Sequence, residues 1–153
     1  MKVLLAIDGS PHSQAAIAAV TRRPWPKGTA VKILTVLHSP TAVMIDVALG
    51  LPPAQRDDEL RQQASTLLDT AGKQIARAAP EITVTTRILE GNPKDVIVEE
   101  ARAWNADLIV VGSHGYSRLR RMVLGSVAGA VVANAPCSVQ VARAKRDLEG
   151  AAA

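Results

Sequence analysis

The sequence predicts an α/β protein with a single open, parallel sheet of five strands in the order 3-2-1-4-5 and helices on both faces. Apolar segments alternate with helical stretches along the chain, and two of these segments are apolar without interruption. The 153 residues suffice for one compact domain. We expect this domain to cover residues 1–145, with a disordered tail at 146–153. The predicted strands span 2–7, 30–37, 82–89, 107–111 and 138–143.

The polarity of each strand predicts its position in the sheet. A strand that is covered on both faces is apolar throughout, whereas an edge strand alternates with polar residues. Residues 3–7 and 108–111 are continuous apolar runs, while residues 82–88 and 138–143 mostly alternate. We therefore expect strands one and four in the middle and strands three and five at the edges. This pattern favours the order 3-2-1-4-5 over 2-1-3-4-5, in which the third strand is central.

The first two helices are recognised by their termini. Ser10 can cap the first helix, and Pro11 suits its first turn. The second helix carries an apolar stripe over residues 60–78 at steps of three and four, and Pro80 ends it. The long connection before it, at 38–53, is apolar in part. It is either a lid over a ligand site or a surface loop that packs on the core.

The last two helices differ in polarity. One follows Asn92 and Pro93 and places its apolar residues at helical spacing. The other starts near Gly125 and contains no charged residue from 126 to 135. We expect this uncharged helix to lie buried against the sheet, with close approach of the backbone at Gly129.

Composition excludes several classes of function. The single cysteine, Cys137, cannot form a disulfide within the chain, and we expect it to act as a small buried apolar side chain. No apolar run reaches the length of a membrane-spanning helix, and the apolar start of the chain is too short for a signal peptide. We therefore expect a cytoplasmic protein with no membrane partner. A net charge of +4 with only three aromatic residues gives thin support for nucleic-acid binding.

Short polar loops follow the two central strands. Residues 8–10 read Asp-Gly-Ser, and residues 112–115 read Gly-Ser-His-Gly. Ligands of open α/β sheets bind outside the carboxyl ends of the strands, at the point where the strand order reverses, so both loops should line one crevice. Gly125 and Ser126 begin the last helix, whose free amides and positive dipole end suit an anion. The sequence therefore predicts an anion-binding cradle that lacks the lysine of a P-loop.

The spacing of these residues resembles that of the universal stress protein family. The ATP-binding signature of this family is Gly-x2-Gly-x9-Gly-Ser/Thr, which Gly112, Gly115, Gly125 and Ser126 match. The Asp-Gly-Ser segment at 8–10 also resembles the family, and the similarity extends over nearly the whole chain. It implies a Rossmann-like fold of the adenine nucleotide alpha hydrolase type.

The resemblance further implies an ATP-binding protein that acts as a nucleotide-dependent sensor or adaptor in a stress response. Asp8 would contact the ribose or adenosine side, and the backbone of Val36 would contact adenine. Mg²⁺ can arrive with the phosphates of ATP. The family also implies a homodimer, and the exposed edge expected at 138–143 could pair with its symmetry mate. The candidate cofactor-binding residues are Asp8, Gly9, Val36, Gly112, Gly115, Gly125, Ser126 and Val127.

The sequence shows few of the residue patterns that are typical of a catalytic site. No pair of nucleophile and base is evident, and the three histidines lack the spacing of metal ligands, so we expect no metal site built by the protein. Asp8 and the arginines at 118, 120 and 121 could support slow ATP hydrolysis at most. Two alternatives to the ATP-binding sensor therefore stay open, namely a nucleotide-free interaction module of the same fold and a slow ATP hydrolase.

Overall fold

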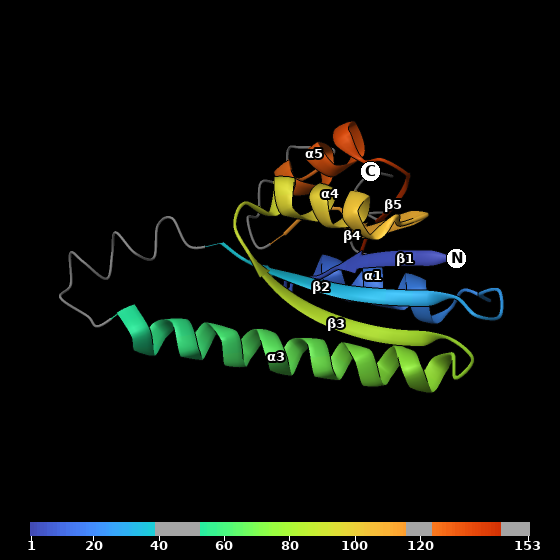
Figure 1. The fold of residues 1–153 in the computed structure, drawn as a ribbon, viewed down its shortest axis with the longest axis horizontal. Helices are drawn as coiled ribbons and strands as arrows, with labels where there is room; N and C mark the ends of the chain where they lie inside the picture. The colour runs from blue at the N-terminus through green and yellow to red at the C-terminus, as the bar shows by residue number, and fades with distance from the viewer. Residues whose placement is uncertain (39–52, 116–123, 145–153) are drawn as a thin grey trace, which may run out of the picture.

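The computed structural model contains one five-stranded parallel sheet with helices on both faces (Figure 1). It describes residues 1–38, 53–115 and 124–144, with side chains from 57 onward in the second range. The connection expected at 38–53, apart from its end residues, and the tail expected at 146–153 lie outside the described residues. The strands are β1 (Lys2–Ala6), β2 (Ala30–Leu37), β3 (Thr83–Glu90), β4 (Leu108–Gly112) and β5 (Ser138–Ala142). The helices are α1 (Pro11–Thr21), α3 (Pro53–Ala78), α4 (Pro93–Trp104) and α5 (Ser126–Asn134).

The strand order is β3-β2-β1-β4-β5, which confirms the predicted order. The register pairs Leu4 of β1 with Lys32 of β2 on one side and with Ile109 of β4 on the other. Leu4 and Leu5 are fully buried although they point to opposite faces of the sheet. The continuous apolar runs therefore mark the two strands that are covered on both faces.

Two apolar cores lie on opposite faces of the sheet. Leu5 and Ile33 lie in the core beneath α1 and α3, while Leu4 and Leu34 lie in the core beneath α4 and α5. In Figure 1, α3 runs along β3 and β2, and α4 and α5 lie on the other side of the sheet. Because side chains alternate along a strand, one strand supplies both cores.

Two helices begin with a side-chain cap, of which the sequence analysis predicted the one at Ser10. Ser10 Oγ accepts a hydrogen bond of 3.2 Å from the amide of Ser13 at the start of α1. Asn92 Oδ1 accepts one of 3.2 Å from the amide of Lys94 at the start of α4. In each helix a proline occupies the first turn, where its missing N–H costs nothing. These caps supply acceptors for amides that have none within the helix.

The expectation that α5 lies buried with close backbone approach at Gly129 is wrong. Ala128 and Val131 are buried, but the side chain of Val132 is 48% exposed. Beyond the backbone of α5 itself and the neighbouring residues, no atom lies within 4 Å of a Cβ built on Gly129. The helix packs on α4 and β5 through one stripe, so its other face lies at the surface. The absence of charge permits burial of a helix but does not require it on every side.

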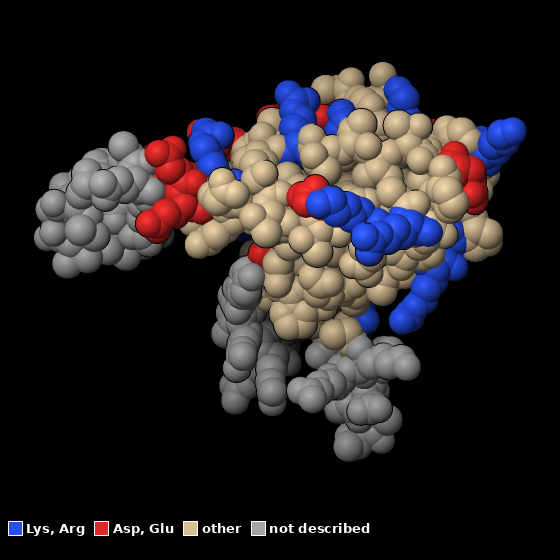
Figure 2. Space-filling model, turned by 90° about the horizontal axis from the view of Figure 1, so that it is seen from below, with Lys and Arg blue, Asp and Glu red and all other residues tan. Residues whose placement is uncertain are grey.

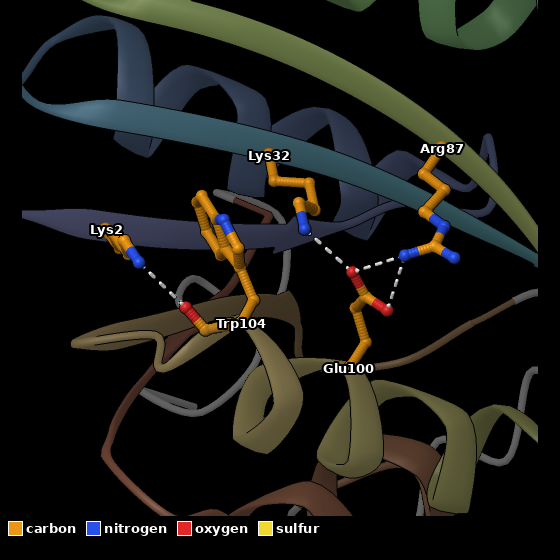
Figure 3. Close-up of polar contacts among 5 residues, drawn as sticks. All are labelled: Lys2, Lys32, Arg87, Glu100 and Trp104. Carbon is orange, nitrogen blue, oxygen red and sulfur yellow. Dashed lines mark hydrogen bonds and ion pairs between the residues drawn. The ribbon is translucent and has the colours of Figure 1, made fainter.

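A buried carboxylate joins α4 to the sheet (Figure 3). Glu100 of α4 is 8% exposed and accepts a hydrogen bond of 2.8 Å from Lys32 Nζ of β2. Both of its oxygens lie 3.1 Å from Arg87 Nη1 of β3. The Lys32 ammonium also lies 4.3 Å from the centroid of the Trp104 ring. We call Glu100, Lys32 and Arg87 the Glu100 cluster, and the sequence analysis did not identify it.

Charges of both signs are interspersed on the face that α3 covers (Figure 2). Lys73 of α3 pairs with Asp69 one turn earlier at 2.7 Å, and Arg61 of α3 pairs with Glu90 of β3. Basic and acidic side chains are therefore paired with one another on the described part of this face. Among the described residues, no helix has the length and apolarity needed to cross a membrane.

Candidate functional site

The loops that follow β1 and β4 meet at the centre of the sheet. β1 pairs with β4 in register, from Val3 opposite Leu108 to Ala6 opposite Val111. A Cβ built on Gly115 would lie 2.9 Å from Asp8 Oδ2, so the two loops are in direct contact. The strand order reverses at this point, and the structure therefore brings the two predicted loops together where ligands of open α/β sheets bind.

A pocket of about 250 Å³ lies between these loops, and we call it the switch-point pocket. It is lined by all the candidate binding residues except Gly9, which instead lines a neighbouring hollow toward β3 and α3. The two hollows share Asp8, Val36 and Pro93 in their walls. The candidate residues that line the switch-point pocket are Asp8, Val36, Gly112, Gly115, Gly125, Ser126 and Val127.

One wall of the switch-point pocket is apolar. Leu34, Pro93 and Ile97 line it together with Val36. Sequence reasoning missed the first three because they follow the ordinary core pattern of a strand and a helix. Their contribution follows from the packing of α4 against β2, which no local signal reveals. An apolar wall beside a few polar groups is typical of small-molecule sites.

Asp8 shapes the turn that follows β1. Its Oδ1 accepts a hydrogen bond of 2.9 Å from the amide of Ser10. Gly9 has a φ of 82°, in the left-handed region that a residue with a side chain rarely adopts. Asp8 is exposed, and its Oδ2 lies toward Gly115. The carboxylate therefore has one oxygen bound to the turn and the other at the boundary between the two loops.

Close contacts with main-chain atoms leave no room for a side chain at Gly112 and little room at Gly125. A Cβ on Gly112 would lie 2.7 Å from the carbonyl carbon of His12, and one on Gly125 would lie 3.0 Å from the Cα of His114. Real Cβ atoms essentially never show the first distance, and the second is tighter than most. Gly115 differs, because its neighbour is the Asp8 carboxylate and not a backbone atom.

The amino terminus of α5 lacks the side-chain cap found in α1 and α4. Its N-cap is Gly125, with φ of −66° and ψ of 162°, and no side chain bonds to its first turn. The first intrahelical hydrogen bond runs from the Gly129 amide to the Gly125 carbonyl at 2.9 Å. The amides of Ser126 and Val127 precede it, and both residues line the switch-point pocket. This end of the helix is suited to an anion.

Two histidines lie on either side of a buried serine beside the pocket. Ser113 is fully buried, and its Oγ lies 3.1 Å from His12 Nδ1 and 3.2 Å from His114 Nδ1. The ring centroids of the two histidines are 5.2 Å apart. Sequence reasoning missed the link between the two histidines through Ser113, because it depends on the packing of α1 against the end of β4. Within the described residues, no three His, Cys, Asp or Glu side chains are grouped as a metal site would need.

Cys137 lies away from the pocket. It is half-buried in the core beneath α4 and α5. Burial raises the pKa of its thiol, and the charge of Asp107 adds to this effect. The prediction of a buried apolar side chain is therefore met in part, because Cys137 packs against the core but is only half-buried. The arginines at 118, 120 and 121, which the sequence analysis connected with slow ATP hydrolysis, lie outside the described residues.

Fold and pocket together define an open α/β domain whose ligand crevice lies where the strand order reverses. The sequence profile of the Universal stress protein family matches residues 1–143. The chain therefore belongs to the universal stress protein family. A protein of Staphylococcus aureus (strain USA300) that is named as a universal stress protein is 32% identical over 142 residues, which cover 92% of this chain and 82% of the relative.

Solved structures share the fold over nearly the whole chain. Hypothetical protein MJ0577 has a TM-score of 0.81 at 24% identity, with 94% of this chain and 96% of that chain covered. A universal stress protein family protein from Arabidopsis thaliana with AMP bound has a TM-score of 0.70 at 20% identity, with coverage of 97% and 94%. A universal stress protein in complex with cAMP has a TM-score of 0.63 at 23% identity, with coverage of 95% and 98%.

Proposed function

We propose that this protein binds an adenine nucleotide, with ATP as the principal ligand, in the switch-point pocket. The observation that carries the proposal is the convergence of three features on one pocket. These are the Asp8 carboxylate, the apolar wall that includes Val36, and the uncapped amino terminus of α5 at Ser126. The structures of family members with AMP and with cAMP support the same class of ligand.

Each part of the pocket suits one part of a nucleotide. The apolar wall of Leu34, Val36 and Ile97 suits the flat adenine ring. The Asp8 carboxylate can accept hydrogen bonds from the ribose hydroxyls. The amides of Ser126 and Val127 can donate to phosphate oxygens. Gly115 leaves open the space between the carboxylate and these amides, and Mg²⁺ can accompany the phosphates.

We propose that nucleotide binding serves a sensor or adaptor role in a stress response, and that turnover of ATP is slow at most. Efficient phosphoryl transfer needs a group that positions or activates the attacking water. Among the described residues that line the pocket, Asp8 is the one carboxylate, and its Oδ1 is already bound to the amide of Ser10. The pocket is therefore better suited to holding a nucleotide than to cleaving it.

We further propose that the protein is a homodimer. β5 pairs with β4 on one side and is the last strand of the sheet, so no strand of the described residues lies on its other side. Pairing of residues 138–143 with the same strand of a second copy would satisfy those backbone groups. Solution scattering at micromolar concentration should give twice the mass of the 16.1 kDa chain. A mass of one chain would contradict the dimer.

The decisive experiment is to identify what the protein carries. Mass spectrometry of small molecules released by denaturing the freshly purified protein should detect an adenine nucleotide. Titration calorimetry of the emptied protein with ATP, AMP and cAMP should then show heat of binding and rank the three. Absence of any bound nucleotide, together with no heat from any of the three, would overturn the proposal and favour a nucleotide-free interaction module.

A further inference from the structure

β3 is the last strand of the sheet on the side away from β5, and the proposed function does not use it (Figure 1). It spans eight residues, Thr83–Glu90, and pairs with β2 in register over its full length. No strand of the described residues lies on its other side. Proline residues and bulges commonly keep an edge strand from pairing with another chain, and both are absent from β3.

Three residues of β3 direct their backbone groups away from the sheet. The amide of Thr83 donates to the carbonyl of Thr29 at 3.0 Å, and the amide of Gly91, just beyond the strand, donates to the carbonyl of Leu37 at 3.1 Å. Because successive residues turn their backbone groups to opposite sides of a strand, the odd-numbered residues of β3 bond to β2. The residues whose N–H and C=O groups face outward are Val84, Thr86 and Ile88.

A groove of about 830 Å³ lies between β3 and α3. Its helix side is formed in part by small residues at helical spacing, namely Ser65, Gly72 and Ala76, and residues 84–88 of β3 form the other side. Ser65 and Ala76 are exposed. Because these side chains are small, they leave room for a second helix to approach α3 along this stripe.

α3 lies above the space between β3 and β2. A Cβ built on Gly72 would lie 3.7 Å from Thr86 of β3 and 4.0 Å from Ile33 of β2. Neighbouring strands are about 4.8 Å apart, so a second copy paired with β3 about a two-fold axis would place its own α3 about 10 Å from this one. Packed helices lie about 8–10 Å apart. One symmetric contact can therefore pair the two strands and pack the two helices at once.

The side chains of β3 select one register for an antiparallel pair of copies. Two registers overlap most of the strand and bring outward-facing residues opposite each other, one centred on Thr86 and one on Arg87. The second would place Arg87 directly opposite Arg87 of the second copy, and like charges in that position are unfavourable. The first places Thr86 opposite Thr86, Val84 opposite Ile88, and Arg87 opposite Thr85. In this register the three outward-facing residues each exchange hydrogen bonds with the second copy.

The charged pair of α3 fits the same two-fold axis. Lys73 Nζ lies 2.7 Å from Asp69 Oδ2, and the two side chains are 66% and 61% exposed. Gly72 lies beside Thr86 and therefore near the axis of the register centred on Thr86. Rotation about this axis reverses the direction of α3, so Asp69 of each copy would approach Lys73 of the other. Opposite charges would then be adjacent across the contact as well as within each helix.

We propose that β3 and α3 form a second interface between copies of this chain, in which the β3 strands pair antiparallel about Thr86 and the α3 helices pack at Gly72. It is separate from the β5 pairing proposed above, because β3 and β5 lie at opposite edges of the sheet. Its groove is lined mostly by small and polar residues, so it buries little apolar surface and should form at millimolar protein concentration. Dimers paired through β5 would then join into longer assemblies.

Thr86→Pro tests the strand pairing. The amide of Thr86 faces outward, so proline at this position removes a hydrogen bond of the proposed interface and none to β2. In sedimentation equilibrium, dimers of the native protein should associate further as the concentration rises into the millimolar range. Thr86→Pro should lower this association constant at least about tenfold.

Val141→Pro is the matched variant at the opposite edge. The carbonyl of Ala142 accepts a hydrogen bond from the Ser113 amide beside β4, so the backbone groups of Val141 face away from β4. This variant should interrupt the β5 pairing and keep the β3 pairing, so its mass at millimolar concentration should be twice that of the 16.1 kDa chain. Identical association of the native protein and Thr86→Pro would overturn the β3 interface while the β5 dimer stands. Conversion of the micromolar dimer into single chains by Thr86→Pro would support the β3 interface and contradict the β5 pairing.

Exchange of the charges on α3 tests the interface without altering the strand. Asp69→Lys places a lysine beside Lys73 of the second copy, so it should lower the association constant about tenfold. Adding Lys73→Asp to this variant restores opposite charges within the helix and across the contact, and association should return to within about twofold of the native value. Equal association of the native protein and both variants would show that α3 lies outside the interface and would overturn the proposal.

Discussion

The switch-point pocket and the Glu100 cluster differ in whether their polar groups are bonded within the protein. In the cluster, the Glu100 carboxylate is 8% exposed and is bonded to Lys32 and Arg87 of the same chain (Figure 3). In the pocket, Asp8 is exposed and the amino terminus of α5 has no side-chain cap. The cluster uses its charges to join α4 to the sheet, whereas the pocket keeps polar groups available to a ligand. Substitutions should therefore separate stability from binding.

The largest effect is expected at Gly115. Gly115→Val should lower nucleotide affinity by about a hundredfold or more, because its side chain would enter the pocket from a Cβ that lies 2.9 Å from Asp8 Oδ2. The fold should survive, since the neighbour is an exposed side chain and not backbone. Calorimetry with ATP and a thermal melt of the same sample measure the two quantities. Unchanged affinity would remove Gly115 from the site.

Gly129→Ala in α5 is the matched control for this substitution. Beyond the backbone of α5 itself and the neighbouring residues, no atom lies within 4 Å of the added Cβ, and the residue does not line the switch-point pocket. Alanine in a helix interior should raise the free energy of unfolding by about 0.5–1 kcal/mol and leave affinity unchanged. Loss of binding in this variant would show that glycine substitutions act on the fold as a whole.

Substitution of Glu100 should have the opposite effect, with a loss of stability and no change in nucleotide affinity. Glu100→Gln removes the charge that Lys32 and Arg87 share, and Lys32 is only 15% exposed. We expect a loss of about 2 kcal/mol in the free energy of unfolding, measured with urea, and no change in nucleotide affinity. Asp69→Asn, in the exposed pair with Lys73, should cost less than about 0.5 kcal/mol. Equal losses for the two variants would contradict the distinction between buried and exposed pairs.

A smaller change is expected at Asp8. Asp8→Asn keeps the Oδ1 acceptor for the Ser10 amide and therefore the turn, but it removes the negative charge. We expect nucleotide affinity to fall about tenfold, because a hydrogen bond to a charged acceptor is stronger than one to a neutral amide. The melting temperature should hardly change. Affinity equal to that of the native protein would confine Asp8 to shaping the turn.

The smallest effect is expected at Cys137. Its raised pKa, caused first by burial and then by the Asp107 charge, keeps the thiol protonated at pH values where an ordinary thiol begins to ionise. Because the thiolate is the reactive form, alkylation by iodoacetamide should be slow at neutral pH and accelerate only above the usual thiol range. Protein unfolded in urea should react at the rate of a free thiol. Equally rapid labelling of the native protein would contradict a half-buried, protonated Cys137.

Sequence reasoning succeeded for features that depend on neighbouring residues of the chain, such as the polarity of a strand or the turn that follows it. The uninterrupted runs in β1 and β4 identified the central strands, and the polar turns after them identified the crevice. It failed where the answer depends on which elements pack together. Glu100 is one charged residue among others on α4, and its burial requires Lys32 and Arg87 from two neighbouring strands. The exposure of Val132 likewise depends on what covers α5, which its uncharged sequence does not show.

The contacts of Gly112, Gly115 and Gly125 indicate which glycine of the Gly-x2-Gly-x9-Gly-Ser/Thr signature reports on ligand binding in related proteins. Main-chain atoms leave no room for a side chain at position 112 and little room at position 125, so the packing of the fold favours glycine there whether or not a ligand binds. A side chain at position 115 would meet only the carboxylate of Asp8, which can move aside. Selection would therefore keep a small residue at this position only while the pocket has to remain open for a ligand. We therefore expect the residue at the position of Gly115 in related sequences to distinguish proteins that keep the proposed ligand site from those that have lost it.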